Sequence, residues 1–469
     1  MVEPPDFDDP GPLPLTPPGR LRRALSVAIV LLLVVSMVVL AWVSGRGEVV
    51  VQPVPTPPAA PTDSIASRLA IVDADGRLLT TDPASGSVVS HGAEGVRYSF
   101  PAWSPDGSRI AAVGTATDAT AVHVFRIGAP GAGGERGDPT VIYRAADRAP
   151  FYLYWAPDGG RLTFLTAEPA GLALRIASAD AGAPATIVRE GSPMYWAWAS
   201  DDRMLVHSGG GGPNAFLGEI RGDGSGAGTF GKGPSGFRAP SISVGGRYRA
   251  FVESGDDGGF TPPGTDRERV VVEASDGGGR HEVEVFSSAV LGFGPRTDDL
   301  AFIAPAAAGR AVALPVGPLR LVDAASGAVR RLVAGSVVAF FWSPDGRTIA
   351  ALRIVAQGED RIAAVTGVGP RRLIPAAPVP GLELRLVFVD VESGAIRSQT
   401  DVRVGDVFVV QLLPYFDQYA LSHRLWAPDS RSIALPLTDG DGTTAVVELP
   451  ADGSDARRVA EGVAGFWSP

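Results

Sequence analysis

An aspartate recurs at one position of a short motif close to WSPDG, and carboxylates repeated in this way could form a ring of metal ligands. The five aspartates are Asp106, Asp158, Asp201, Asp345 and Asp429. In two degenerate copies the same position holds Gly245 and Arg296, which cannot serve as carboxylate ligands. The run S-P-D-G is also typical of a tight turn, because Pro presets φ, Asp tolerates turn geometry and Gly adopts the left-handed conformation. We therefore interpret these aspartates as turn residues and predict no metal site.

Residues that could act as nucleophiles or metal ligands show no productive spacing. The chain has no cysteine, which excludes thiol catalysis, disulfides and cysteine-based metal sites. The five histidines fall in different segments, without ligand spacing: His91, His123, His207, His281 and His423. The G-x-S-x-G motif of hydrolases is absent from the sequence. We predict no catalytic residue and no cofactor, while a small carboxylate-based site in the central channel of the fold stays open as an alternative.

Aromatic residues crowd into one short segment near the C-terminal end. Within nine residues the chain places Tyr415, Phe416, Asp417, Tyr419 and His423, although aromatic residues make up only 7% of the whole. An aromatic cluster with a charged residue, next to long insertions, is typical of a recognition patch. The other interpretation is that the aromatic side chains fill core space under the longest insertion. We predict binding residues here and keep both interpretations.

The aromatic position of the motif recurs along the chain, which indicates a repeat protein. Six copies carry tryptophan, namely Trp103, Trp155, Trp198, Trp342, Trp426 and Trp467. Two degenerate copies carry Ile242 and Phe293 instead. In each full copy a short apolar strand precedes the turn and a run such as "RIAAV" returns after it, and a hairpin such as "VDAASGAVRRLV" follows. Each unit therefore has four strands, and the tryptophans are expected to pack between units.

The two ends of the repeat region each carry part of one unit. The first unit, beginning near Leu69, lacks its first strand, and the C-terminal "VAGFWSP" of Val463–Pro469 supplies a first strand without the rest. Pairing the two would close a ring and remove open sheet edges. The sequence therefore predicts an all-β fold, an eight-bladed β-propeller closed by its N- and C-terminal strands, with a seven-bladed propeller as the alternative.

The WSPDG-x-x-IA unit resembles the repeat of TolB-like β-propellers, which is also similar to the propeller parts of prolyl-oligopeptidase relatives. The resemblance covers Leu69 to Pro469. In that family the repeat is structural, so the resemblance implies a fold and no catalytic residue. The bacterial TolB protein is a periplasmic partner in an envelope complex, which makes an envelope protein or peptide the implied kind of partner.

A long apolar run precedes the repeats and predicts a membrane anchor. Residues Ala24–Gly45 carry no charge and would span about 33 Å as a helix, enough to cross a hydrocarbon layer of about 30 Å. Arg20, Arg22 and Arg23 precede the run, which favours a cytoplasmic N-terminus. A cleaved signal peptide is the alternative. The predicted domains are a disordered cytoplasmic tail (1–23), a transmembrane helix (24–45), a Pro-rich linker (46–65) and the propeller (66–469).

The net charge and the predicted membrane anchor narrow the classes of function open to this protein. The net charge of −10, without a basic run in the main body, argues against nucleic acid as a partner. The sequence predicts a single-pass membrane protein whose propeller lies outside the cytoplasm and binds an envelope protein or peptide. The alternative is a small-ligand or glycan receptor, or an enzyme, with its site at the mouth of the propeller channel.

Overall fold

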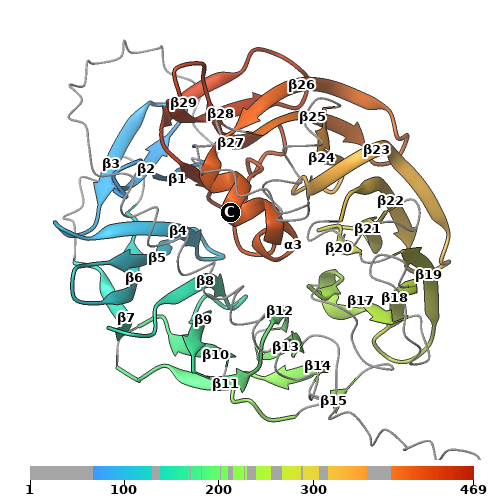
Figure 1. Ribbon diagram of the computed structural model, residues 1–469, viewed down its shortest axis with the longest axis horizontal. Coiled ribbons are helices and arrows are strands. Elements are labelled where there is room, and N and C mark those ends of the chain that lie inside the picture. Colours follow the sequence, from blue (N-terminus) through green and yellow to red (C-terminus); the bar gives the residue numbers. More distant parts are fainter. Residues whose placement is uncertain are drawn as a thin grey trace, which may run out of the picture. The chain divides into compact units, whose positions relative to one another are not determined.

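Antiparallel β-sheets make up most of the described chain (Figure 1). The computed structural model describes residues 67–128, 138–169, 171–180, 182–200, 202–209, 215–226, 228–229, 239–254, 267–286, 289–305, 315–355 and 382–469. The sheets follow one another around a common centre, each with one strand facing inward, as in a β-propeller. The predicted all-β propeller fold is confirmed.

Five sheets have four strands each, in simple meander order. The first contains β30 (Ala464–Trp467), β1 (Leu69–Val72), β2 (Leu78–Asp82) and β3 (Ser87–His91). The second contains β4 (Arg97–Trp103), β5 (Arg109–Thr115), β6 (Thr120–Arg126) and β7 (Thr140–Ala145). The third contains β8 (Pro150–Trp155), β9 (Arg161–Glu168), β10 (Gly171–Ser178) and β11 (Thr186–Glu190). The fourth contains β12 (Met194–Ser200), β13 (Arg203–Ser208), β14 (Phe216–Arg221) and β15 (Gly228–Thr229). The fifth contains β16 (Ser241–Ile242), β17 (Tyr248–Ser254), β18 (Arg267–Ala274) and β19 (Arg280–Phe286), with the 3₁₀ turn η1 (Val244–Gly246) between β16 and β17.

A ten-stranded sheet completes the described strands. It contains β20 (Val290–Phe293), β21 (Asp299–Ile303), β22 (Gly317–Asp323), β23 (Val329–Trp342), β24 (Thr348–Ile354), β25 (Leu382–Asp390), β26 (Ile396–Val404), β27 (Ser432–Thr438), β28 (Thr444–Pro450) and β29 (Arg457–Glu461). Its continuity rests on two joins. The long β23 pairs with β22 through its first part and with β24 through its second, and β26 meets β27 through the single pair Val404 and Leu437.

The C-terminal strand completes the first sheet. Strand β30 pairs with β1 in antiparallel register, with Leu69 opposite Trp467 and Val72 opposite Ala464. The backbone of Arg68 also donates to Ser468 Oγ at 3.1 Å. The two ends of the repeat region therefore share one sheet, as the half repeat predicts.

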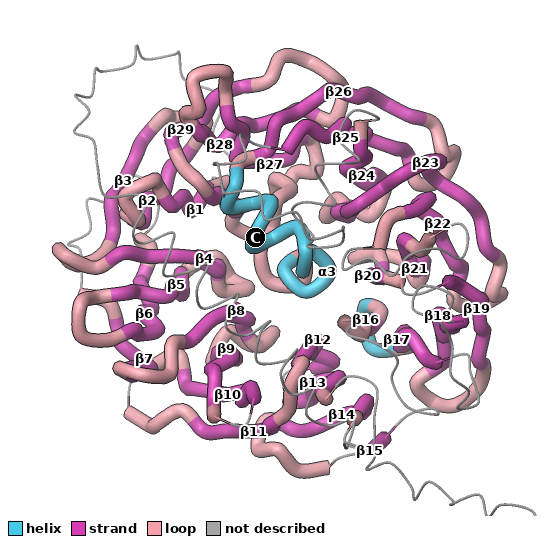
Figure 2. The backbone as a smooth tube through the Cα atoms, viewed as in Figure 1, coloured by secondary structure: helices cyan, strands magenta, loops and turns pink. Residues whose placement is uncertain are grey.

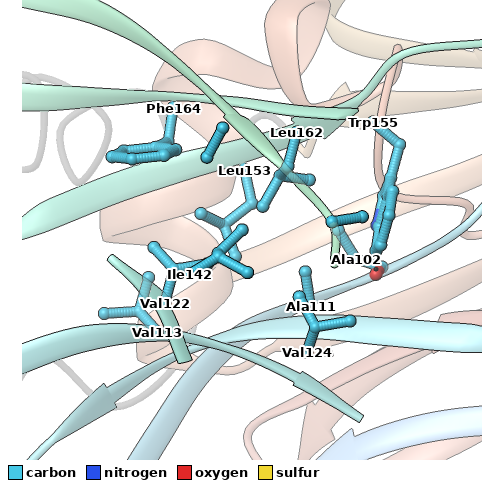
Figure 3. Packing of buried hydrophobic residues seen from close by; sticks show 12 residues of the cluster. Ala102, Ala111, Val113, Val122, Val124, Ile142, Leu153, Trp155, Leu162 and Phe164 are labelled. Carbon is cyan, nitrogen blue, oxygen red and sulfur yellow. Dashed lines mark hydrogen bonds between the residues drawn. The ribbon is translucent and has the colours of Figure 1, made fainter. Parts of the chain in front are cut away.

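Apolar side chains from neighbouring sheets meet and form the core. Between the β4–β7 and β8–β11 sheets, Val122 and Val124 of one sheet face Leu153, Leu162 and Phe164 of the next (Figure 3). All five side chains are buried. Burial on both faces explains why the second strand of each unit reads as a nearly continuous apolar run.

Tryptophan side chains also join neighbouring sheets. The indole Nε1 of Trp103 donates to Phe466 O (3.0 Å), and that of Trp155 donates to Ala102 O (2.9 Å). Trp426 Nε1 donates in the same way to Phe341 O at 2.9 Å. In each case the acceptor is the residue just before the aromatic position of the preceding sheet, so the same bond joins several pairs of neighbouring sheets.

The N-terminal segments lie outside the described residues, including the run 24–45. Within the ranges that are described, no helix has both the length and the apolar character needed to cross a membrane. The predicted transmembrane helix therefore stays a prediction.

Candidate functional site

A short helical segment in the C-terminal part of the chain occupies the centre of the sheets (Figure 2). It runs from the π-helical turn η2 (Phe408–Leu412) through the 3₁₀ turn η3 (Leu413–Tyr415) to α3 (Phe416–Tyr419), and we call residues 405–423 the central segment. The apolar residues Phe408, Leu412 and Phe416 recur every four residues, the spacing that aligns side chains along one helical face. All three are buried.

Aromatic side chains of the central segment pack against the inner strands. The ring of Phe416 lies 5.5 Å from that of Phe340 on β23, and the ring of Tyr419 lies 5.4 Å from that of Phe100 on β4. His423 stacks edge-to-face on Phe466 of β30 at 4.7 Å. Such pairs stabilise a core beyond the area they bury. The segment is therefore built into the interior.

Two inner strands are distorted where they meet the central segment. Phe100 on β4 and Tyr152 on β8 have positive φ values of 47° and 49°, which are uncommon for residues with a side chain. The pairing register shifts beside each, between Ser99 and Ala102 and between Phe151 and Tyr154. A bulge of this kind re-aims a side chain. Both aromatic rings contact Tyr419.

Gln418 holds three polar contacts in the interior. Its Nε2 donates to Trp196 O and to Tyr152 Oη, both at 2.8 Å, and its Oε1 accepts from Trp196 N at 3.2 Å. The Tyr152 hydroxyl in turn donates to Gln418 O. Burial raises the pKa of Tyr152 well above its ordinary value, so this hydroxyl stays protonated and able to donate. The network links α3 to β8 and β12.

Asp417 and His423 are two titratable members of the predicted patch, and both are almost fully buried. Asp417 Oδ2 accepts from the backbone of Ala239 at 3.4 Å. His423 Nε2 donates to the carbonyl of Phe100 at 3.4 Å, and its Nδ1 accepts from Ser422 Oγ at 2.7 Å. A carbonyl can only accept, so this pattern assigns the neutral Nε2–H tautomer. Burial lowers the pKa of His423 to about 4, although the bond to Phe100 O opposes the shift.

The contact between Ser422 and His423 resembles that of a serine hydroxyl with its general base. His423, however, is poorly suited to act as a general base. A general base works best when its pKa lies near the operating pH, and His423 titrates well below neutrality. The group that orients the imidazole is a backbone carbonyl, which cannot stabilise an imidazolium as a carboxylate does. The arrangement therefore positions the central segment better than it serves acyl transfer.

The predicted binding residues are thus brought together, but in the interior. Phe416, Asp417, Tyr419 and His423 are all less than 9% exposed, and only Tyr415 keeps intermediate exposure. The sequence left two interpretations open, a recognition patch and aromatic side chains that fill core space, and this burial fits the second. The physical reason is that the segment folds as helical turns that reach the inner strands, so its aromatic rings find core contacts. Their role in binding stays a prediction.

The repeated aspartates serve their own turns. Asp106 Oδ1 accepts from Ser104 Oγ at 2.6 Å and from Ser108 N at 3.1 Å, and the Ser104 bond is the main cause that lowers the pKa of Asp106 to about 2. Asp345 makes the same bonds with Ser343 and Arg347. Asp201 lies outside the described residues. No cluster of three or more His, Asp or Glu side chains suited to a metal ion occurs within the described ranges.

Comparison with known proteins finds similar structures only. No protein-family model and no curated protein matches the chain. TolB from Acinetobacter baumannii is 12% identical over 86% of this chain and 67% of that one, with a TM-score of 0.37. The dihydro-heme d1 dehydrogenase NirN is 12% identical over 88% of this chain and 77% of its own, with a TM-score of 0.47. An oligogalacturonate lyase in complex with manganese is 13% identical over 84% and 83%, with a TM-score of 0.42.

TolB proteins are therefore among the structural neighbours, as the resemblance of the repeat implies. The neighbours also include enzymes. At these identities and TM-scores the likeness assigns neither an activity nor a partner to this chain.

Proposed function

We propose that this protein is a membrane-tethered propeller outside the cytoplasm that binds a protein or peptide of the cell envelope. The uncharged run 24–45, with arginines before it, supports the tether and the orientation. The net charge of −10 disfavours nucleic acid. The proposal makes the propeller a scaffold and assigns it no reaction.

The observation that carries this proposal is the environment of the side chains in the central segment. Its polar groups bond to the inner strands, as Gln418 does with Tyr152 and Trp196, and they converge on no open reactive centre. The same segment leaves Val410 45% exposed, and further along it Tyr415 is partly exposed. We propose this exposed part of the central segment as the contact with the partner.

We also propose eight blades. Five sheets have four strands each, and the ten-stranded sheet divides at the two joins within β23 and between β26 and β27. The isolated pair of Trp426 and Ile433 supplies an inner position for the last of the three parts. This division supports eight units over the alternative of seven.

A small-ligand or glycan receptor, or an enzyme with a site at the channel mouth, is the second candidate. The polar contacts of Ser422 with His423 Nδ1 (2.7 Å) and Tyr152 Oη (3.2 Å) favour it, since they place hydroxyl and imidazole groups together. The low pKa of His423 weighs against a general base at neutral pH.

In-cell crosslinking of the full-length protein, followed by mass spectrometry, tests the proposal. We expect a defined envelope protein to crosslink to the wild type and to be lost in Val410→Arg. The matched control is Val329→Arg, because Val329 on β23 is also 45% exposed but lies on an outer strand segment. Equal capture by both variants would contradict binding at the central segment. Failure to capture any reproducible protein, with a thermal shift caused by glycans, would favour the second candidate.

A further inference from the structure

Three arginines stack over the tryptophan of the next sheet in the same way. The guanidinium of Arg68 lies 5.6 Å from the ring centre of Trp103, that of Arg109 lies 5.1 Å from Trp155, and that of Arg161 lies 5.9 Å from Trp198. A cation over an indole face within about 6 Å is attracted by the ring quadrupole. The pair is thus a repeated contact between neighbouring sheets.

Strand register identifies a fourth arginine of this series. Each stacking arginine directly precedes the residue that pairs with the tryptophan of its own sheet. Leu69 pairs with Trp467, Ile110 with Trp103 and Leu162 with Trp155. Met204 pairs with Trp198 in the same way, so Arg203 occupies the position of Arg68, Arg109 and Arg161.

The aromatic partner of Arg203 is missing from the next sheet. The residue at the tryptophan position of the β16–β19 sheet is Ile242, which pairs with Arg249 on β17. An isoleucine side chain is much smaller than an indole and offers no π face. Arg203 therefore lacks the stacking partner that its three equivalents have, and its side chain is 56% exposed.

A cavity opens at this place between the two sheets. Its volume is about 550 Å³, within the range of about 300–1,000 Å³ usual for ligand sites. Its walls come from the two sheets, and the lining includes Ala199, Ser200, Arg203, Glu219, Ile242 and Arg249. Glycines form further parts of the wall, and a Cβ added to Gly228 or Gly245 would meet no atom within 4 Å. We call this cavity the Ile242 slot.

Charged side chains at the slot are already held in place. Arg203 Nη1 lies 3.3 Å from Glu219 Oε2, and Arg249 Nη1 lies 3.9 Å from Glu219 Oε1. Arg249 also pairs with Glu273 at 2.5 Å and is only 14% exposed. The lining of the slot thus combines the apolar side chains of Ala199 and Ile242 with guanidinium groups and with a carboxylate that can accept from an N–H or O–H group.

We propose that the Ile242 slot binds an aromatic side chain of a partner peptide, a tryptophan or tyrosine. The ring stacks under Arg203 in the place that Trp155 and Trp198 take in the preceding sheets, and its N–H or O–H donates to Glu219 or to a backbone carbonyl. Aromatic anchors in desolvated pockets dominate the binding energy of many interfaces. This inference rests on the proposed peptide-binding function and names a contact point for it.

Ligand-observed NMR with N-acetyl-L-tryptophanamide and the full-length protein tests the slot. We expect saturation transfer to the indole protons, at least tenfold stronger than to N-acetyl-L-leucinamide. Ile242→Trp should fill the slot from within and reduce the signal at least tenfold. The matched control is Val244→Trp, which adds a tryptophan two residues away at a position 58% exposed and outside the lining. Equal signals in wild type and Ile242→Trp, or equal signals from the two amides, would overturn the inference.

A second filling variant covers the case in which Ile242→Trp does not fold. Gly228→Phe places a ring in the slot from β15, where the added Cβ meets open space. It should abolish the indole signal, and an unchanged signal would again overturn the inference.

The crosslinking experiment separates the two proposals. If a partner is still captured by a slot-filled variant, the slot is wrong and the scaffold stands. If Val410→Arg and Val329→Arg behave alike while the indole binds, the slot stands and the central-segment contact is wrong.

Discussion

The indole of Trp103 donates a 3.0 Å hydrogen bond to the carbonyl of Phe466, a residue near the opposite end of the repeat region. Strand β30, which carries Phe466, is thus held on two sides. It pairs with β1 through its backbone, and it accepts this bond from the neighbouring sheet. The closing strand uses the same contact that joins Trp155 to Ala102 elsewhere in the molecule.

The bond from indole to carbonyl should contribute measurably to stability. We predict that Trp155→Phe, which removes the bond to Ala102 O, lowers the free energy of unfolding by about 1–3 kcal/mol beyond the effect of the smaller ring. The matched control is Trp198→Phe. Trp198 also lies under an arginine, but its Nε1 has no hydrogen-bond partner among the described residues. Denaturant unfolding measures both, and equal losses would show that the bond contributes nothing.

The network around Gln418 should hold the central segment in place. We predict that Tyr152→Phe costs about 1–3 kcal/mol, because it removes the buried bonds that the Tyr152 hydroxyl makes with Gln418 O and Gln418 Nε2. Hydrogen exchange of the amides in residues 416–423 should speed up. Tyr143→Phe is the control, since its hydroxyl makes one exposed bond to Arg148 O and should change stability by less than about 0.5 kcal/mol. Unchanged exchange in Tyr152→Phe would contradict the network's role.

Stability should depend on pH through His423. The folded protein protonates this side chain only near pH 4, because burial lowers its pKa from the ordinary 6.5. The unfolded chain therefore binds more protons as the pH falls. The contribution of His423 is fully present above pH 6.5 and is lost as the pH falls from about 6.5 to about 4, by about 3 kcal/mol in total.

His423→Gln isolates this effect. The variant should be less stable than the wild type at pH 7, and the difference should shrink as the pH falls towards 4. Unfolding free energies measured from pH 7 to pH 4 give the comparison. A wild type and variant whose stabilities fall in parallel over this range would show that His423 is not the titrating group.

The repeated blade could be predicted from the sequence because the same motif occurs in each unit. A tryptophan, a tight turn and an apolar returning strand recur together, and the unpaired Val463–Pro469 then has one partner that completes a sheet. The physical constraint is local, since turn residues and strand patterns need no knowledge of distant contacts.

The place of the central segment could not be predicted in the same way. Tyr415 to His423 occur once, and an aromatic cluster has the same composition whether it faces solvent or core. Burial is decided by distant residues such as Phe100 and Phe340, whose rings meet it only in the folded chain. The sequence does show the origin of the Ile242 slot, because Ile242 replaces the tryptophan of one repeat. That replacement predicts a slot only once the structure places Arg203 of the preceding sheet beside it.

The thermal unfolding midpoint of the protein without Val463–Pro469 tests the closed ring most directly. Leu69 and Ile71 on β1 are fully buried, and removing β30 exposes their strand edge. The account predicts a fall of at least about 5 °C. An unfolding entropy of about 2.1 cal/mol/K per residue makes 1 kcal/mol worth about 1 °C in a propeller of this size, and the deletion removes buried Phe466 and Trp467, worth about 3–5 kcal/mol each. A deletion variant that stays monomeric and melts at the temperature of the full-length protein would contradict the closure of the ring.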